Sequence, residues 1–385
     1  MWTAGLAGSP AKRRDLASER TGLVPLLESE LILRDTYEVE RFIGEGAFAE
    51  VYRVKHRFLG RQALKLFKRP GMSVEDIQEM LGEAILLSRI GHPNIVRVFD
   101  ANVLEMQGGQ RGYFTMEHVS GGSLRKFWQS HGEALVPVPT ALDLIKQVCR
   151  GIAVAHSEHP PIIHRDIKPD NILVGYEAEG LRARVSDFGL AKSVNPLTLL
   201  ATTAGTVSFK PPEAFLEKKG DSCASDVWGI GATLYMLLTD RLPERSASNR
   251  STTPAAALTP PSKVNPDVDA GLDQLVQTAL NEDPAGRYRD AKEFLAALEG
   301  WRPAHVTGSA RAKRFSGEPS KLSINGEDAR DSVEAQRLVN SAEELARAGR
   351  LAEAADAMEE AFNRLPDLRD RHSDTVRLWR RGISM

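Results

Sequence analysis

The spacing of apolar residues changes along the chain and predicts different secondary structure in different parts. From Tyr37 to Phe67, apolar residues alternate with polar ones or form short runs around a Gly-rich turn, which predicts three strands. From Val74 to Ile90 they recur at steps of three and four, which predicts an amphipathic helix. Gly91 and Pro93 follow and end it. A small β-rich part is therefore expected first.

After Gly121 and Gly122 the pattern is mainly helical. The longer predicted helices span Thr140–Ser157, Ala224–Leu238, Gly271–Leu280 and Asp290–Leu298. A small β-rich lobe followed by a larger helical lobe is the expected arrangement, an α+β fold. We place this domain at residues 35–302.

The regions on either side of this domain differ from it in composition. Residues 1–34 are expected to form a flexible N-terminal extension whose last part packs on the domain. Residues 303–330 are polar, with several serines and a basic patch, and are expected to be a linker. Residues 331–385 carry two apolar stripes separated by a turn at Gly349-Arg350, which predicts a small all-α segment.

Composition narrows the classes of protein that fit. Lys plus Arg number 50 and Asp plus Glu 52, and this balance argues against nucleic acid as the main partner. Two cysteines cannot form a disulfide framework, so a reducing compartment fits. The N-terminus lacks the pattern of a signal peptide, and the longest apolar run is well short of the ~20 residues that cross a bilayer. We expect a cytoplasmic protein without a transmembrane segment.

Two features in the β-rich part suit a polyphosphate. Ile43-Gly44-Glu45-Gly46 precedes Val51, and glycines between two strands let a hairpin offer backbone N–H groups to phosphates. By itself this string fits an ordinary glycine turn better. Lys65 lies in an apolar strand and needs an anionic partner or a route to solvent. It is either an edge-strand lysine that reaches solvent or a phosphate ligand held by Glu79 or Glu83.

The strongest chemical signal is His164-Arg165-Asp166-Ile167-Lys168-Pro169-Asp170-Asn171, followed by Asp187-Phe188-Gly189. Phosphoryl transfer needs a carboxylate that orients a hydroxyl, a cation that stabilises phosphate charge, and hard oxygen ligands for Mg²⁺. Asp166, Lys168, Asn171 and Asp187 provide these groups. The two strings in this order, after a glycine loop and an isolated lysine, are very improbable by chance.

With these motifs the sequence resembles the eukaryotic-like (Hanks-type) serine/threonine protein kinases of bacterial style, over about residues 35–301. The resemblance implies a two-lobed fold with ATP and Mg²⁺ as cofactors and protein substrates as partners. It implies that Asp166 is the catalytic base, that Lys168 contacts the γ-phosphate, and that Asn171 and Asp187 bind Mg²⁺. The residues it implies for holding ATP are Ile43, Gly44, Gly46, Val51, Ala63, Lys65 (paired with Glu83), Met116, Glu117 and Val119.

The resemblance also bears on substrate and regulation. Lys168 resembles the serine/threonine class, and Arg165 resembles kinases that are switched on by a phosphate in the segment from Asp187 to Glu213. The candidate acceptors are Thr198, Thr202 and Thr203, with Thr202 or Thr203 favoured; the alternative is that they are solvated loop threonines. Thr206 matches the position that faces the substrate hydroxyl. Autophosphorylation on this segment is expected. Asp240 to Pro266 departs from the family, which has a substrate-docking helix there.

Three further matches are implied. Asp226 resembles the residue that anchors the catalytic loop, and Glu213 with Arg287 resembles a buried ion pair. The C-terminal stripes resemble one tetratricopeptide-like hairpin, which would dock on the kinase, dimerise or bind a partner helix; an amphipathic hairpin without a partner is the alternative. The rival functions are a pseudokinase-type scaffold and a small-molecule kinase of related fold.

Overall fold

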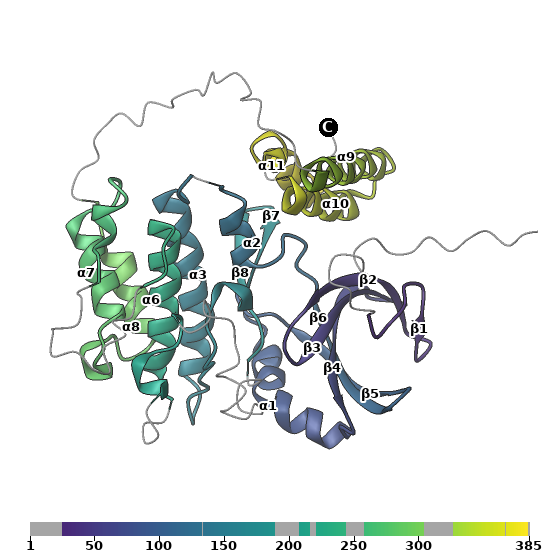
Figure 1. Cartoon of the computed structure of the whole chain (residues 1–385), viewed down its shortest axis with the longest axis horizontal. Helices are drawn as coiled ribbons and strands as arrows, with labels where there is room; N and C mark the ends of the chain where they lie inside the picture. The colour runs from purple at the N-terminus through teal and green to yellow at the C-terminus, as the bar shows by residue number, and fades with distance from the viewer. Residues whose placement is uncertain are drawn as a thin grey trace, which may run out of the picture. The chain divides into compact units, whose positions relative to one another are not determined.

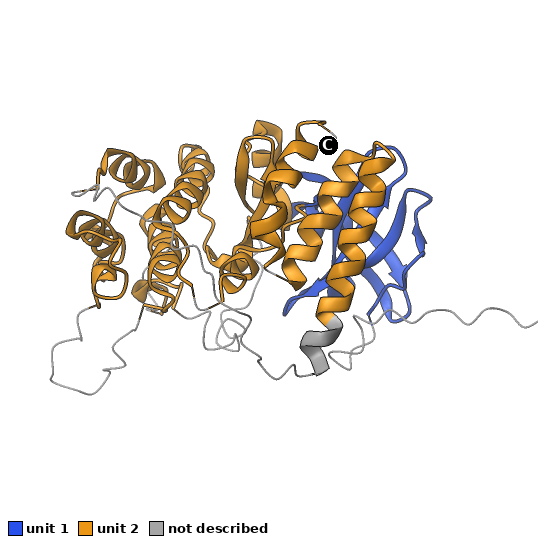
Figure 2. Cartoon of the chain, turned by 90° about the horizontal axis from the view of Figure 1, so that it is seen from above, with its two compact units in different colours: residues 1–79, 98–118 blue, residues 80–97, 119–385 orange. Residues whose placement is uncertain are grey.

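The computed structural model describes residues 25–132, 134–188, 208–215, 221–243, 258–303, 326–365 and 367–383, with side chains from 331 in the last helical part. Within these ranges the chain forms two compact units. Unit 1 comprises residues up to 79 together with 98–118, and unit 2 comprises 80–97 and everything from 119 onwards (Figure 2). The N-terminal β-rich part and the helical part that the sequence predicts correspond to these two units.

Unit 1 is built on one six-stranded antiparallel sheet in the order β1-β2-β3-β4-β6-β5. Its strands are β1 (Ile32–Leu33), β2 (Tyr37–Glu45), β3 (Ala49–His56), β4 (Gly60–Pro70), β5 (Val98–Met106) and β6 (Gly109–Glu117). Alternate residues of the central strands, including Tyr52, Val54, Leu64 and Leu66, are completely buried. This period of two places one face of the sheet in the core.

The end of the N-terminal extension packs on this sheet, as the sequence predicts. The side chain of Leu27 is only 4% exposed and belongs to the same apolar cluster as Tyr52. The backbone N–H of Leu26 donates to Glu50 Oε2 at 2.9 Å, and that of Leu27 donates to the Tyr52 hydroxyl at 3.0 Å. The sheet itself begins at Ile32, before the predicted start of the domain.

Helix α1 spans Val74–Ile90, the same residues that the periodicity predicts. Its apolar side is buried at Ile77, Leu81 and Leu87. Gly112 of β6 lies directly beside Ile77, so close that a Cβ there would come within 2.6 Å of the isoleucine side chain. A side chain at this glycine would push the helix away from the strand.

Unit 2 contains a helical core around helix α6. The helices of this core are α2 (Leu124–Gln129), α3 (Val138–His156), α6 (Cys223–Thr239), α7 (Ala270–Ala279) and α8 (Ala291–Gly300). Nearly every residue of α6 is buried, as expected for a helix enclosed on all sides. Helices α3, α7 and α8 pack around it (Figure 1). A two-stranded antiparallel sheet, β7 (Ile172–Glu177) with β8 (Gly180–Val185), packs on α3.

A buried ion pair joins two segments of unit 2 that are 74 residues apart in the chain. Arg287 Nη1 and Nη2 donate to Glu213 Oε1 and Oε2 at 2.6 and 2.8 Å, a bidentate arrangement. Arg287 Nε donates to the carbonyl of Asn281 at 2.6 Å, and the guanidinium lies over the Trp228 ring at 5.0 Å. The ion pair that the resemblance implied is confirmed.

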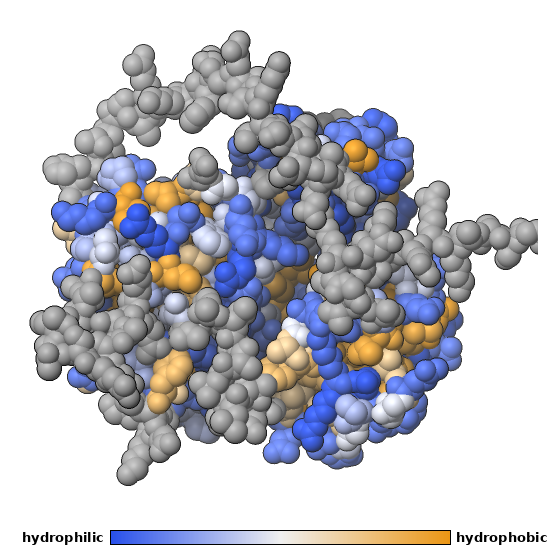
Figure 3. All heavy atoms as spheres, viewed as in Figure 1, coloured by the Kyte–Doolittle hydropathy of each residue, from blue (hydrophilic) through white to orange (hydrophobic). Residues whose placement is uncertain are grey.

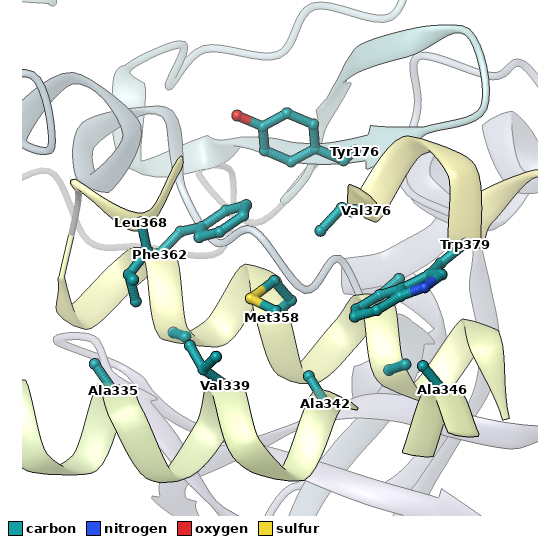
Figure 4. Packing of buried hydrophobic residues seen from close by; sticks show 13 residues of the cluster. Tyr176, Ala335, Val339, Ala342, Ala346, Met358, Phe362, Leu368, Val376 and Trp379 are labelled. Atoms are coloured by element: carbon teal, nitrogen blue, oxygen red, sulfur yellow. The ribbon is translucent and has the colours of Figure 1, made fainter. Parts of the chain in front are cut away.

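Three C-terminal helices complete unit 2: α9 (Gly326–Arg347), α10 (Leu351–Arg364) and α11 (Leu368–Arg380). Both predicted stripes are helical, and a third helix, α11, follows them and buries Val376 and Trp379. Their buried faces form one apolar cluster, and Tyr176 of β7 belongs to it (Figure 4). The Tyr176 ring meets the Phe362 ring edge to face at 5.8 Å. Of the alternatives left open by the sequence, the structure therefore shows docking on the helical unit.

Glu359 of α10 is a fully buried acid within this C-terminal packing. Its Oε1 accepts from Arg380 Nη2 at 2.8 Å, and the same nitrogen donates to Asp356 Oδ1 at 2.7 Å. Burial raises the pKa of Glu359 to about 7, even though Arg380 opposes the shift. One guanidinium shared by two carboxylates cannot balance both negative charges, so one acid retains its proton more readily.

In the view of Figure 3, hydrophilic side chains cover most of the coloured surface, and apolar ones gather in small groups. The exposed large apolar side chains include Phe58, Leu59, Leu86 and Phe99. Among the described residues, no helix is both long and apolar enough to span a bilayer.

Removing the buried guanidinium is expected to destabilise unit 2 strongly. In Arg287→Ala, Glu213 would remain buried without its partner, which typically costs about 3–5 kcal/mol of unfolding free energy. Urea denaturation followed by circular dichroism measures this loss. Arg289→Ala is the matched control, because Arg289 is 83% exposed and its ion pair with Glu293 lies at the surface. Equal stability of the two variants would contradict the prediction.

Glu359 gives stability a specific pH dependence. Between pH 4.5 and about 7 the folded protein holds a proton at Glu359 that the unfolded chain has released, so this contribution to stability falls as pH rises through that window. Glu359→Gln carries no titrating proton. Its unfolding free energy relative to wild type is therefore expected to increase by about 3 kcal/mol from pH 4.5 to 7.5. A difference that stays constant with pH would refute this.

Candidate active site

The loop that carries Asp166 is held by a carboxylate from helix α6. Asp226 Oδ2 accepts the backbone N–H of His164 at 2.7 Å, and its Oδ1 accepts that of Arg165 at 2.9 Å. His156 Nε2 lies 3.0 Å from Oδ2. Gly229 lets α6 approach, since a Cβ there would lie 2.8 Å from the carbonyl oxygen of Ile167. The anchoring role implied for Asp226 is confirmed.

The carboxylate of Asp166 is surrounded by donors. Lys168 Nζ lies 2.8 Å from its Oδ2, and Asn171 Nδ2 donates to the same oxygen at 3.0 Å. Lys210 Nζ lies 3.1 Å from Oδ1. Burial would raise the pKa of Asp166, but Lys210 and Lys168 outweigh it and hold this pKa below its ordinary value. Asp166 is therefore ionised at neutral pH, the form that can accept a proton.

The β7–β8 hairpin brings Asn171 next to the Asp187 segment. Asn171 directly precedes β7, and the register pairs Ile172 with Val185. The backbone N–H of Ser186 donates to the Asn171 carbonyl at 2.9 Å. Asn171 Nδ2 donates to both Asp166 Oδ2 and the Asp166 carbonyl. The amide nitrogen is thus committed to Asp166, and the amide oxygen is the atom that remains suited to a cation.

Two residues of this loop region hold a left-handed backbone conformation. The φ angles of Arg165 and Asp187 are 68° and 66°. Such angles are uncommon outside glycine and cost about 1–3 kcal/mol each when the surroundings impose them. Contacts on both sides fix this backbone: His164 bonds to the Ser186 carbonyl at 2.8 Å, and its ring meets Phe188 at 4.6 Å.

Arg165 contacts two acids of unit 2. Its Nη1 lies 3.5 Å from Glu83 Oε2 of α1, and its Nε lies 3.2 Å from Asp221 Oδ2. From the sequence, Arg165 was predicted to bind a phosphate and Glu83 to pair with Lys65. The structure adds a contact between Arg165 and Glu83, while the pairing of Glu83 with Lys65, which belongs to the other unit, stays a prediction.

In unit 1 the strand register gathers the residues predicted to hold a nucleotide. Val51 lies opposite both Gly44 and Lys65, and Ala63 lies opposite Met116. Opposite residues in antiparallel strands share a face, as do residues two apart, so all five lie on one side of the sheet. Gly46 N–H donates to the Ala49 carbonyl at 2.8 Å and closes the hairpin. Ile43 precedes it in β2, and Glu117 is the last residue of β6.

Apart from Glu83, the predicted site residues in unit 2 comprise one group and one separate residue. Asp166, Lys168 and Asn171 are joined by direct contacts. Asn171 directly precedes β7, and Asp187 follows β8, the strand paired with β7. Val119 lies elsewhere in this unit, beside β7, where a Cβ on Gly175 would come within 3.1 Å of its side chain. Thr198, Thr202, Thr203, Thr206 and Gly189 lie outside the described residues.

Comparison with known proteins decides the family. Residues 37–297 match the family described as "Protein kinase domain". The chain belongs to this family. The match spans both units, from β2 to the last turns of α8.

Curated relatives are serine/threonine kinases. The chain is 34% identical over 208 residues to "Serine/threonine-protein kinase ATG1c" of Arabidopsis thaliana, covering 54% of this chain and 27% of that protein. It is 34% identical to "Serine/threonine-protein kinase Pkn1" of Myxococcus xanthus, covering 73% and 40%. It is 30% identical to "Serine/threonine-protein kinase PknA" of Mycobacterium tuberculosis, covering 70% and 62%. The chain thus spans less than half the length of several relatives.

A solved structure agrees with the fold. The crystal structure of the Mycobacterium tuberculosis PknI kinase domain matches with a TM-score of 0.53 and 25% identity, covering 71% of this chain and 98% of that one. The protein kinase fold, a β-sheet lobe and a helical lobe, is therefore confirmed, with C-terminal helices in addition.

Protein kinases use ATP and Mg²⁺, and the residues of this kinase domain suit that metal. Within the described residues, no group of three or more His, Cys, Asp or Glu forms a cage for a metal. Mg²⁺ does not need one, because it keeps several waters and takes one or two protein oxygens together with substrate phosphates. The amide oxygen of Asn171 and the carboxylate of Asp187 are oxygen donors of this kind.

Lys210 is a site residue that sequence analysis missed. Its Nζ contacts Asp166 Oδ1 and also donates to the Arg165 carbonyl at 2.6 Å. In the sequence it is one lysine two residues before Pro212, 44 positions beyond Asp166. Nothing in that spacing indicates the contact, because it depends on how the chain returns to the loop.

Lys210 is expected to compete with the acceptor hydroxyl for Asp166, since Lys168 and Asn171 already hold the other oxygen. Lys210→Met in dephosphorylated protein should raise kcat/KM for a generic acceptor such as casein by about twofold to fivefold, because a partly exposed ion pair is worth up to about 1 kcal/mol. The KM for ATP should not change. Lys210→Arg, which keeps the contact, is the control. A tenfold fall in kcat/KM for Lys210→Met would contradict this role.

Proposed function

We propose that this chain is an ATP- and Mg²⁺-dependent protein serine/threonine kinase, which transfers the γ-phosphate of ATP to Ser or Thr hydroxyls of proteins. The observation that carries the proposal is the grouping around Asp166: an ionised carboxylate in direct contact with Lys168 and with the amide of Asn171. Phosphoryl transfer requires this combination of proton acceptor, cation and oxygen ligand.

Each residue of this group would have one task. Asp166 would orient the acceptor hydroxyl and take its proton, and Lys168 would stabilise negative charge on the transferred group. Asn171 and Asp187 would hold Mg²⁺, which neutralises phosphate charge when bound. Positioning supplies most of the rate in this reaction class, which fits a loop whose backbone is fixed by Asp226.

In unit 1, the residues on one face of the sheet would hold the nucleotide. Lys65 would contact the phosphates, with Glu83 as its predicted partner, and the Gly44–Gly46 hairpin would cover them with backbone N–H groups. The remaining contacts would be apolar ones to the adenine and backbone ones from the end of β6 and from Val119, where unit 2 resumes. They involve Ile43, Val51, Ala63, Met116, Glu117 and Val119.

The serine/threonine class and a protein substrate rest on two supports. Lys168, in the string Asp-Ile-Lys-Pro-Asp-Asn, is typical of the serine/threonine class. Its contact with Asp166 places it where it could stabilise the transferred phosphate. The curated relatives are named serine/threonine-protein kinases. The acceptors would be Ser or Thr hydroxyls of proteins, and autophosphorylation would occur on Thr202 or Thr203.

Three finer assignments belong to the proposal. The helical pair α9–α10 would be a tetratricopeptide-like hairpin, consistent with its antiparallel pairing and the turn at Gly349. The protein would act in the cytoplasm on protein substrates rather than on nucleic acid, consistent with its balanced charge. The domain limits would be 35–302 for the kinase and 331–385 for the helical segment.

The proposal is tested by phosphate transfer from radiolabelled ATP with Mg²⁺. Wild type should label itself or a generic acceptor, and Asp166→Asn should lose at least about 100-fold in rate, because a positioned general base contributes 10²–10⁴-fold. Asp240→Asn, a change of the same kind at the end of α6, is the control. Equal labelling by wild type and Asp166→Asn would refute the role of Asp166, and the absence of labelling in both would favour a scaffold.

A further inference from the structure

The C-terminal helices dock on the segment that links unit 1 to the helical core. This segment, Val119–Ser123, begins one residue after unit 1 ends at His118. It is tied to β7, because Val174 N–H donates to the Gly122 carbonyl at 2.8 Å, and Ser123 forms a bridge with Leu173. Whatever holds this segment also holds Val119, one of the residues predicted to hold ATP.

Polar contacts from α10 and α11 hold the segment at Ser120. Its hydroxyl donates to Asp356 Oδ1 at 2.6 Å, and its carbonyl accepts from Asn363 Nδ2 at 3.3 Å. Arg380 Nη2 donates to the same Asp356 oxygen at 2.7 Å, and Arg380 Nε donates to the Tyr176 carbonyl of β7 at 2.9 Å. We call Ser120, Asp356, Glu359 and Arg380 the clasp. Charge-assisted bonds of this kind are among the stronger ones.

Two glycines, Gly121 and Gly175, leave room for the Glu359 side chain of the clasp to lie against the backbone. A Cβ on Gly121 would lie 3.2 Å from Glu359 Oε2 and 2.2 Å from the Val174 carbonyl oxygen. A Cβ on Gly175 would lie 3.6 Å from Glu359 Oε2 and 3.1 Å from the Val119 side chain. The packing therefore runs without a gap from α10 through Gly175 to Val119.

The apolar contacts and a second arginine extend the same interface. Tyr176 and Phe362 meet edge to face within the cluster shown in Figure 4. Arg369 of α11 donates to the Ser130 hydroxyl, and its guanidinium lies over the Phe127 ring of α2 at 4.7 Å. Contacts with β7, with α2 and with Val119–Ser123 fix one position of the C-terminal helices on the rest of unit 2.

We propose that the C-terminal helices are a positioning element for nucleotide binding, which acts by holding Val119–Ser123 through the clasp. The inference rests on the proposed function, since Mg-ATP is taken as the ligand. Asp356 and Arg380 are positioning residues in this scheme, because they act on the nucleotide through Ser120 and Val119. Weakening the clasp frees the segment and lowers the affinity for Mg-ATP.

The experiment uses the full chain carrying Asp356→Asn or Arg380→Gln. Isothermal titration calorimetry should show the Kd for Mg-ATP rising about threefold to tenfold, the range expected for coupling through packed side chains. Hydrogen–deuterium exchange should increase in peptides covering 119–124 and 172–178. In steady-state kinetics of the same variants, the KM for ATP should rise while kcat changes less than twofold.

Glu343→Gln is the matched control, because it changes an acid to an amide in an exposed α9 pair with Arg347. It should leave both Kd and exchange as in wild type. Faster exchange with an unchanged Kd would show that the helices only cover the surface, and it would overturn the inference. Unchanged exchange in both variants would also overturn it. A wild type that does not bind Mg-ATP would overturn the proposed function and the clasp together.

Discussion

The structure of the candidate site depends on one carboxylate, that of Asp226. It binds two consecutive backbone N–H groups, at His164 and Arg165, from a helix that is buried on all sides. A backbone that must hold a left-handed residue at Arg165 cannot stay in place without such support. Asp166, the residue directly after Arg165, is positioned by this contact. A catalytic residue on a loop is held in place only as well as the buried contacts hold the loop.

Two charged side chains of that loop each contact two groups of opposite charge. Asp166 faces Lys168 and Lys210, while Arg165 faces Glu83 and Asp221. In the proposed function, an acceptor hydroxyl would replace Lys210, and a phosphate would replace an acid at Arg165, while the second partner of each remains.

Much of the fold was predictable because its elements follow local patterns. Helix α1 has the predicted limits, and α3, α6, α7 and α8 differ from their predicted limits by two residues or fewer. Asp166, Lys168 and Asn171 were predictable as a group because they lie within six residues, and the structure joins them by contact. Their roles, and those of the residues in unit 1, remain predictions.

What sequence patterns could not supply is contact between segments that are far apart in the chain. Lys210 reaches Asp166 across 44 residues and Ser120 reaches Asp356 across 236, and neither residue belongs to a local pattern. The apolar stripes of α9 and α10 predicted that a face needs a partner but left its identity open, since an apolar face is not selective. The partner is determined by polar groups that only tertiary structure brings together. Arg380, with one nitrogen on Asp356 and Glu359 and another on the Tyr176 carbonyl, selects β7 in a way that hydrophobic periodicity cannot encode.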